Sequence, residues 1–200
     1  MKERSTAKQN KKKLTERLIA LLLCVLMLVI TAGCSAKSDA QKKVARELDA
    51  LKTSESVGSE VDTLRRALSD EGKASFDAFL KNLRNFDYEI TGESVAEDHM
   101  TVTVRIRTCD FGREYLATWT GYLREHGDTI GSDDELTGFY EELFARLAAL
   151  EKKDCIKDVE IVCIEPLGNG EWIANIKDND QLQDAIFGGM LSEMRTLAGE

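Results

Sequence analysis

Few side chains in this 200-residue chain have the types and spacing needed for acid–base, nucleophilic or metal chemistry. Its two histidines, His99 and His126, lie in a polar stretch between two predicted strands and at the end of a predicted helix, where we expect solvated roles. The sequence has no His-Glu-x-x-His, Cys-x-x-Cys, P-loop or dinucleotide glycine motif. We therefore predict no metal site and no cofactor, and an enzyme is the less favoured interpretation.

Two acidic segments could supply oxygen ligands. Asp178, Asn179, Asp180 and Asp184 resemble the start of a calcium loop, but the glycine and the terminal glutamate of an EF-hand are missing. Residues 133–135 stand at the start of a predicted helix, where the helix dipole favours acidic side chains. Helix capping is the better interpretation of both segments.

Arg105 and Arg107 are a more specific pair, because alternation along a strand points them to the same face, together with Cys109. If that face is covered, the two guanidinium groups need acidic partners or an anionic ligand. If the face is open, they are ordinary solvated side chains.

The three cysteines after residue 34 are Cys109, Cys155 and Cys163, and an odd number cannot all pair within one chain. Cys155 and Cys163 are eight residues apart on an extended segment, too far to bond to each other. A disulfide from Cys109 to either of them stays open. The alternative is that all three are small buried residues, as free cysteines commonly are.

About a quarter of the basic residues precede a run without charged residues. Seven lysines and arginines lie between Lys2 and Arg17, and the 16 residues 18–33 carry no charge. As a helix these 16 residues would be roughly 24 Å long at ~1.5 Å per residue. A helix that crosses a bilayer core requires ~20 residues, so this stretch is short for a permanent span. The pattern is that of an export signal, with a basic region followed by an apolar one.

The run ends in the sequence ITAGCS at residues 30–35, with small residues directly before Cys34 and a polar stretch after it. This resembles the lipobox of bacterial lipoproteins, although Thr31 stands where that family most often has leucine. The resemblance implies a diacylglycerol on the Cys34 sulfur, cleavage between Gly33 and Cys34, and attachment to the cell membrane on its extracytoplasmic face. An uncleaved signal anchor and a signal cleaved without lipidation are the alternatives.

The expected domain organisation follows from that cleavage: residues 1–33 are the signal peptide, 34–38 the lipidated cysteine and its tether, and 39–200 one domain. Loss of seven basic and two acidic residues leaves 20 basic and 34 acidic ones, so the exported part has a net charge of −14. Such a domain does not suit a nucleic-acid partner, and an anionic bilayer surface repels it.

Hydrophobic periodicity predicts an α+β fold. Apolar residues at helical spacing predict N-terminal helices, a helical insertion and a C-terminal helix, and alternation with period two predicts two β-hairpins. Because an isolated hairpin is unstable, the two should pair into one curved antiparallel sheet of about four strands, with helices on its apolar face. The predicted helices are 39–53, one after Ser59 that Gly72 closes, one to about residue 85, one after Gly112, one after residue 132, and one after Asn179 or Asp180; the predicted strands include 101–108, 158–165 and 171–177.

This order of elements, with a TVTVRI strand at residues 101–106 and an NGEWIA strand at 169–174, is similar to bacterial lipoproteins of unknown function. Those are placed with the cone-shaped, nuclear-transport-factor-like or cystatin-like superfamily. The resemblance implies a pocket between the concave sheet face and the covering helices. Its candidate aromatic residues are Tyr115, Trp119, Tyr122 and Trp172, for which ordinary core packing is the alternative.

The sequence thus favours a lipid-anchored binding domain whose partner is an envelope protein or a small ligand. The alternatives are an enzyme or isomerase that uses the cone pocket, and a module that assembles with copies of itself through the exposed sheet face. The superfamily hosts all three, so its fold does not decide between them.

Overall fold

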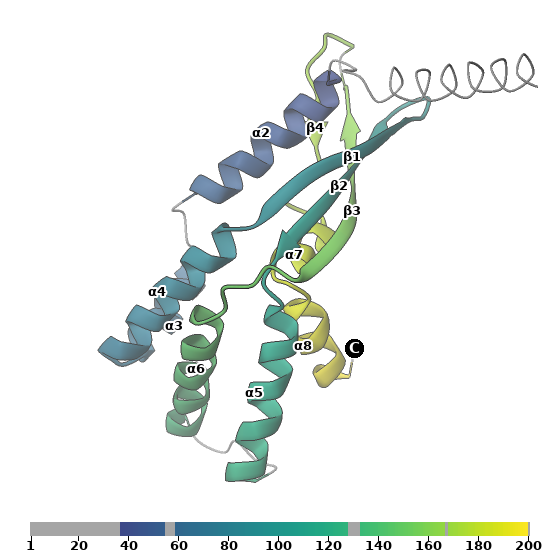
Figure 1. Ribbon diagram of the computed structural model, residues 1–200. Helices are drawn as coiled ribbons and strands as arrows, with labels where there is room; N and C mark the ends of the chain where they lie inside the picture. The colour runs from purple at the N-terminus through teal and green to yellow at the C-terminus, as the bar shows by residue number, and fades with distance from the viewer. Residues whose placement is uncertain (1–36, 55–58, 128–132, 167, 200) are drawn as a thin grey trace, which may run out of the picture. The chain divides into compact units, whose positions relative to one another are not determined.

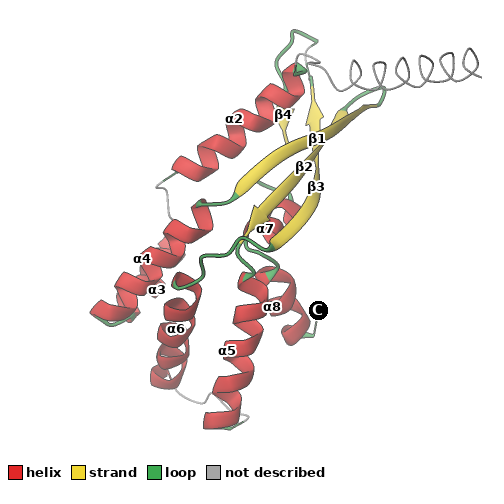
Figure 2. Cartoon of the chain, in the orientation of Figure 1, coloured by secondary structure: helices red, strands yellow, loops and turns green. Residues whose placement is uncertain are grey.

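The computed structural model describes residues 37–54, 59–127, 133–166 and 168–199. The predicted signal peptide, its cleavage site and Cys34 lie outside the described residues. The chain from Ser38 onward is one compact unit with its own hydrophobic core. Its elements, drawn in Figures 1 and 2, are α2 (Asp39–Thr53), α3 (Ser59–Ala67), α4 (Asp70–Arg84), β1 (Asp87–Val95), β2 (Met100–Thr108), α5 (Phe111–His126), α6 (Asp133–Ala148), β3 (Cys155–Ile164), β4 (Ile173–Ala174), α7 (Asp180–Ile186) and α8 (Met190–Ala198).

The four strands form one antiparallel sheet in the order β1-β2-β3-β4, so the predicted α+β class and the pairing of two hairpins are confirmed. Alternation along β2 and β3 sends one set of side chains inward, with Val102 opposite Ile161 and Val104 opposite Val159. These side chains are buried, because α2 and α7 cover this face of the sheet. Together they form a first hydrophobic cluster, the sheet cluster.

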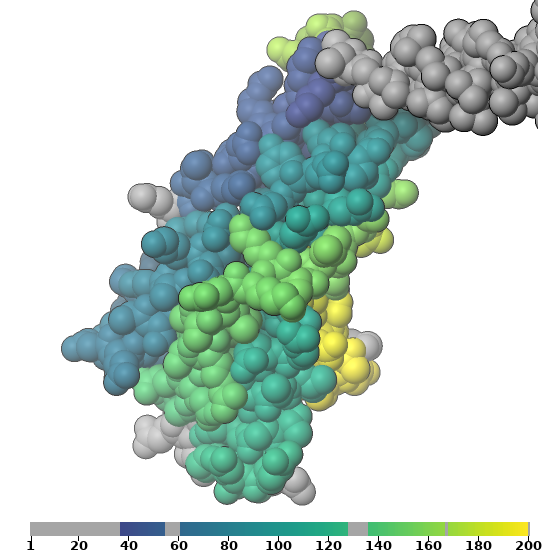
Figure 3. All heavy atoms as spheres, viewed as in Figure 1, coloured from purple at the N-terminus to yellow at the C-terminus, as the bar shows by residue number. Residues whose placement is uncertain are grey.

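A second cluster, the helical cluster, lies among α3, α4, α5, α6 and α8. Aromatic rings dominate it: Phe79 meets Phe111 edge-on with 5.5 Å between centroids, and Phe144 lies 4.6 Å from Phe76. Such tilted and edge-on contacts are the favourable geometries for aromatic pairs. In the space-filling view of Figure 3, the helices α4 to α6 form the lower part of the domain, below α2 and the sheet.

Three of the predicted element boundaries were wrong. Gly72 does not close a helix: its N–H donates to the Oγ of Ser69, which is the N-cap of α4. The predicted strand 171–177 is only two residues long: the Asn175 N–H still donates to the Val162 carbonyl on β3, but the Ile176 N–H turns back to the Ala174 carbonyl and the chain leaves the sheet there. The single predicted C-terminal helix is two helices, separated at Gly188 and Gly189.

Gly188 and Gly189 let the link between α7 and α8 lie close to the backbone at the start of α5. Both have positive φ values, +56° and +85°, which glycine adopts without steric strain. The Gly112 N–H, in the first turn of α5, donates to the Gly188 carbonyl at 3.1 Å. A Cβ atom on Gly188 would overlap the carbonyl oxygen of Cys109. The link from α7 to α8 therefore lies directly against the backbone at the start of α5.

Asp184 on α7 holds the same region together electrostatically. Its Oδ2 lies 2.6 Å from the Lys157 Nζ on β3, and its Oδ1 accepts the N–H of Ser192 at 2.8 Å. The second bond caps α8, whose N-cap residue is a glycine without a capping side chain. Burial raises the pKa of the Asp184 carboxyl, but the Lys157 ammonium and the Ser192 amide outweigh burial, so the pKa lies below its ordinary value.

Candidate functional site

The two arginines predicted as a pair lie on the outer face of the sheet, which none of the described helices covers. Arg105 binds Asp158 directly across the strands, with its Nε 2.8 Å and its Nη2 3.0 Å from the two carboxylate oxygens. The hydrogen bond from Arg105 holds the pKa of Asp158 below its usual range. Arg107 is exposed. The open-face interpretation is therefore the correct one.

Cys109 does not share that face, because β2 ends at Thr108 and the chain turns into the helical cluster. The described cysteines Cys109, Cys155 and Cys163 are all free, so the open question of a disulfide is answered in favour of small, mostly buried residues. Burial raises the pKa of each thiol, that of Cys163 to about 11. Protonated thiols are poor nucleophiles, so these positions do not suit thiol catalysis.

The structure brings three of the four predicted pocket aromatics together, but around another ring. Tyr115, Trp119 and Tyr122 on α5 surround Phe139 of α6, all edge-on at centroid distances of 6.3, 5.3 and 5.5 Å. Trp172 packs instead against the sheet cluster. The structure therefore does not bring the four residues together, and the burial of Tyr115 and Tyr122 fits their alternative interpretation as core residues.

Both histidines lie at the positions that the sequence predicts, His99 between two strands and His126 at the end of a helix. His99, in the β1–β2 turn, has its Nδ1 2.7 Å from an oxygen of Asp98, and His126 stacks on Tyr122 at the end of α5. Among the described residues, no group of three or more histidine, cysteine or acidic side chains could hold a metal ion.

In the described part of the acidic segment 178–184, the structure shows helix capping, as the sequence predicts. Asn179 is the N-cap of α7, because its Oδ1 accepts the N–H of Leu182 at 2.9 Å. The helix α6 does begin at Asp133, although the side chains of residues 133–135 lie outside the described set.

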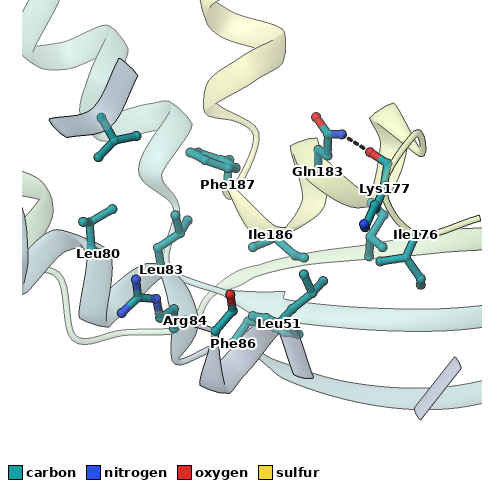
Figure 4. Close-up of a pocket in the computed structure, with 13 residues that line it drawn as sticks. Leu51, Leu80, Leu83, Arg84, Phe86, Ile176, Lys177, Gln183, Ile186 and Phe187 are labelled. Carbon is teal, nitrogen blue, oxygen red and sulfur yellow. Dashed lines mark hydrogen bonds between the residues drawn. The ribbon is translucent and has the colours of Figure 1, made fainter. Parts of the chain in front are cut away.

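The best candidate for a functional site is a cavity of about 400 Å³ that opens to solvent between α2, α4 and α7 (Figure 4). We call it the α2–α4–α7 cavity. None of the 13 described residues that line it belongs to a strand. It therefore lies beside the sheet and not on its concave face, which α2 and α7 fill. Its lining residues are Leu51, Ser54, Val61, Leu80, Leu83, Arg84, Phe86, Ile176, Lys177, Leu182, Gln183, Ile186 and Phe187.

The cavity forms where the two clusters meet. Phe86, Ile176 and Leu182 come from the sheet cluster, whereas Leu83 and Phe187 belong to the helical cluster. On the side of the sheet cluster, Phe86 and Leu182 are almost completely buried, and on the other side Leu83 and Phe187 are partly buried against the helical cluster. The space between the walls is therefore set by two separate packing arrangements. A pre-formed apolar cavity of this size is within the range that small ligands occupy, roughly 300–1,000 Å³.

Polar groups are confined to a few positions around this apolar wall. Arg84 ends α4, Lys177 lies in the loop before α7, and the Gln183 side chain donates to the Lys177 carbonyl at 2.7 Å (Figure 4). No carboxylate is among the described lining residues. The site can therefore bind an apolar group and offers only positive charge beside it.

Sequence reasoning placed several of these lining residues in the core but did not bring them together. Leu51 lies in the predicted helix 39–53, Leu80 and Leu83 lie in the predicted helix that ends at about residue 85, and Ile186 and Phe187 lie in the predicted last helix. The cavity depends on how segments more than a hundred residues apart meet, and periodicity does not report that.

No known family, curated protein or solved structure matches the chain. Among the described helices, none has the length and apolar character needed to cross a bilayer.

Proposed function

We propose that this protein is a lipid-anchored, extracytoplasmic binding domain that holds a small apolar ligand in the α2–α4–α7 cavity. The observation that carries the proposal is the cavity itself: about 400 Å³ of space with an apolar wall from both hydrophobic clusters. Burial of apolar ligand surface in such a site is favourable by roughly 25 cal/mol per Å². The location rests on the lipobox-like sequence at residues 30–35.

Ligand binding is tested on residues 38–200, because both clusters lie within that unit. The probe is N-phenyl-1-naphthylamine, a neutral dye whose fluorescence rises in apolar surroundings. We expect saturable binding of one dye per protein. The variant Leu83→Trp fills the cavity and should weaken binding at least tenfold.

The matched control is Leu116→Trp, which makes the same substitution on the exposed side of α5, away from the cavity. It should bind the dye as the parent protein does. Thermal unfolding of both variants, followed by circular dichroism, checks that they are folded. Equal binding by the two variants, or no saturable binding by the parent, would contradict the proposal.

Anchoring is tested separately by replacing Cys34 with alanine in the full chain. The variant should keep its signal peptide and stay at the uncleaved size, because lipid transfer to the sulfur precedes cleavage at this kind of site. A variant that stays membrane-bound and is processed to the same size would overturn the lipobox assignment. So would mass spectrometry of natively produced protein that found the initiating methionine and no lipid.

The described residues that line the cavity include few side chains of the types that serve as catalytic acids or bases. Among the described lining residues there is no histidine, carboxylate, cysteine or tyrosine to act as an acid or base. The buried carboxylate of Asp184 already pairs with Lys157 and lies outside the cavity. Tyr88 donates to Asp49 at 2.9 Å, and burial together with Asp49 raises the pKa of Tyr88 to about 12, but this pair also lies elsewhere.

Self-assembly is a second candidate function, which one specific observation favours. On the outer sheet face Val162, Ile164 and Ile173 are neighbours, and all three are exposed. A contiguous apolar patch on an otherwise charged surface is typical of an interface. If this patch pairs with its copy on a second molecule, sedimentation velocity will show a dimer that Ile164→Lys abolishes. A monomer at every concentration would contradict it.

A further inference from the structure

We infer that the ligand of the α2–α4–α7 cavity is an amphipathic anion, a single apolar chain that carries one carboxylate or a similar acidic group. This inference rests on the proposed function, because it specifies the ligand of the same site. It is argued from the charges around the cavity, the partners of those charges and the size of the space.

The charge around the cavity is opposite to that of the domain. From residue 34 onward the chain has 34 acidic and 20 basic residues, yet the charged groups among the described lining residues are Arg84 and Lys177 only. In a domain with an excess of carboxylates, a site with positive charge alone attracts anions locally and repels cations.

Neither cation is neutralised from within the described part of the domain. Some basic residues of the domain are neutralised by close acidic partners: Arg65 lies 2.6 Å from Asp77, and Lys157 lies 2.6 Å from Asp184. No such ion pair involves Arg84 or Lys177 among the described residues. Their charges are therefore available to a ligand.

The helix dipole explains only one of the two positions. Arg84 stands in the last turn of α4, where the free carbonyl groups favour a cation. The C-terminal end of a helix does not explain the positive charge of Lys177, since this residue lies in the loop between β4 and α7. That loop is held in place by the hydrogen bond from the Gln183 side chain to the Lys177 carbonyl.

The apolar wall lies between the two cations. Figure 4 shows Arg84 and Lys177 on opposite sides of Leu51, Phe86 and Ile186. A chain that lies along this wall buries its methylene groups and places its end near one of the cations. A charge-assisted hydrogen bond at that end is about twice as strong as a neutral one.

The volume favours one chain. About 400 Å³ is near the lower limit for sites of drug-sized ligands. A two-chain membrane lipid would leave much of its apolar surface outside, whereas a single chain of medium length is buried. The inferred ligand is therefore a free single-chain acid.

The experiment compares three ligands with the same ten-carbon chain and different ends: decanoate, decanol and decyltrimethylammonium. Each displaces N-phenyl-1-naphthylamine from residues 38–200 in low-salt buffer at pH 7. Decanoate should bind at least tenfold more tightly than decanol, a factor that corresponds to about 1.4 kcal/mol. Decyltrimethylammonium should bind more weakly than decanol.

The double variant Arg84→Gln with Lys177→Gln should bind decanoate and decanol equally, and so lose the preference for decanoate. Its matched control is Lys81→Gln with Arg107→Gln, which removes two exposed positive charges outside the cavity and should keep the preference. This control separates direct contact from the change in net charge. High salt should also reduce the preference, because exposed charges are screened.

The outcomes separate the two claims. Equal binding of decanoate and decanol, or a preference that survives in the Arg84/Lys177 variant, overturns this inference and leaves the binding function intact. If the dye and all three ligands fail to bind the parent protein, the proposed function itself is wrong.

Discussion

Replacing Asp184 should show how much of the domain's stability depends on one carboxylate. Asp184→Asn keeps a side-chain oxygen for the Ser192 N–H but removes the charge that faces Lys157. Breaking a fully buried ion pair costs roughly 3–5 kcal/mol. Because the Lys157 side chain is 36% exposed, against 11% for Asp184, we expect a smaller loss in the free energy of unfolding, about 2 kcal/mol.

Asp184→Ala also removes the cap of α8. A lost N-cap costs about 1 kcal/mol, so the alanine variant should lose about 3 kcal/mol in total. The difference between the two variants isolates the bond to Ser192. Urea unfolding of residues 38–200, followed by circular dichroism at pH 7, measures both losses.

The pH dependence tests the electrostatic part. Because the pKa of Asp184 is lower in the folded than in the unfolded state, its charge stabilises the fold above the unfolded pKa of about 3.9, and this contribution is lost as the pH falls. The gap between the parent and Asp184→Asn should therefore be full at pH 7 and shrink below about pH 4. Equal stability at pH 7, or a gap that widens in acid, would refute the reasoning.

Three further substitutions test other parts of the fold by the same unfolding assay. Gly188→Ala should cost at least 2 kcal/mol, since its Cβ meets the Cys109 carbonyl at a positive φ; Gly121→Ala, a helical site with open space, should instead stabilise by up to about 1 kcal/mol, and a reversed order would refute the clash. Thr108→Val should stabilise by about 1 kcal/mol, because the buried Thr108 hydroxyl has no hydrogen-bond partner among the described residues; a clear loss of stability would refute this. Asn82→Ala should cost about 1–2 kcal/mol, because the amide donates to the carbonyl of Ala148, the last residue of α6, at 2.9 Å and to that of Leu150 just after the helix at 3.1 Å; an unchanged midpoint would mean that solvent replaces those bonds.

Much of the fold could be predicted from the sequence, because its signals are local. Ser38 stands where a cap is needed and accepts the N–H of Gln41, so the first helix was predicted with its correct ends. The alternation of Val102, Val104 and Ile106 likewise fixed which face of β2 is buried.

The errors occurred where tertiary contacts decide the outcome. The segment after Asn179 has helical periodicity throughout, but Gly188 must pass close to the backbone of Cys109, so the helix breaks there. The aromatic stripe from Tyr115 to Tyr122 was a correct helix face, yet only the position of α6 determines that it packs on Phe139. The cavity was beyond sequence reasoning for the same reason.

The position of the cavity at the junction of two clusters also bears on how the domain opens. Proteins open in cooperative units, and each cluster here is a natural unit of that kind. A ligand between them is in contact with both, so it stabilises each unit only while the other is closed. Saturation with ligand should then slow amide hydrogen exchange in β2 and in α4 together, and so make the two halves unfold as one.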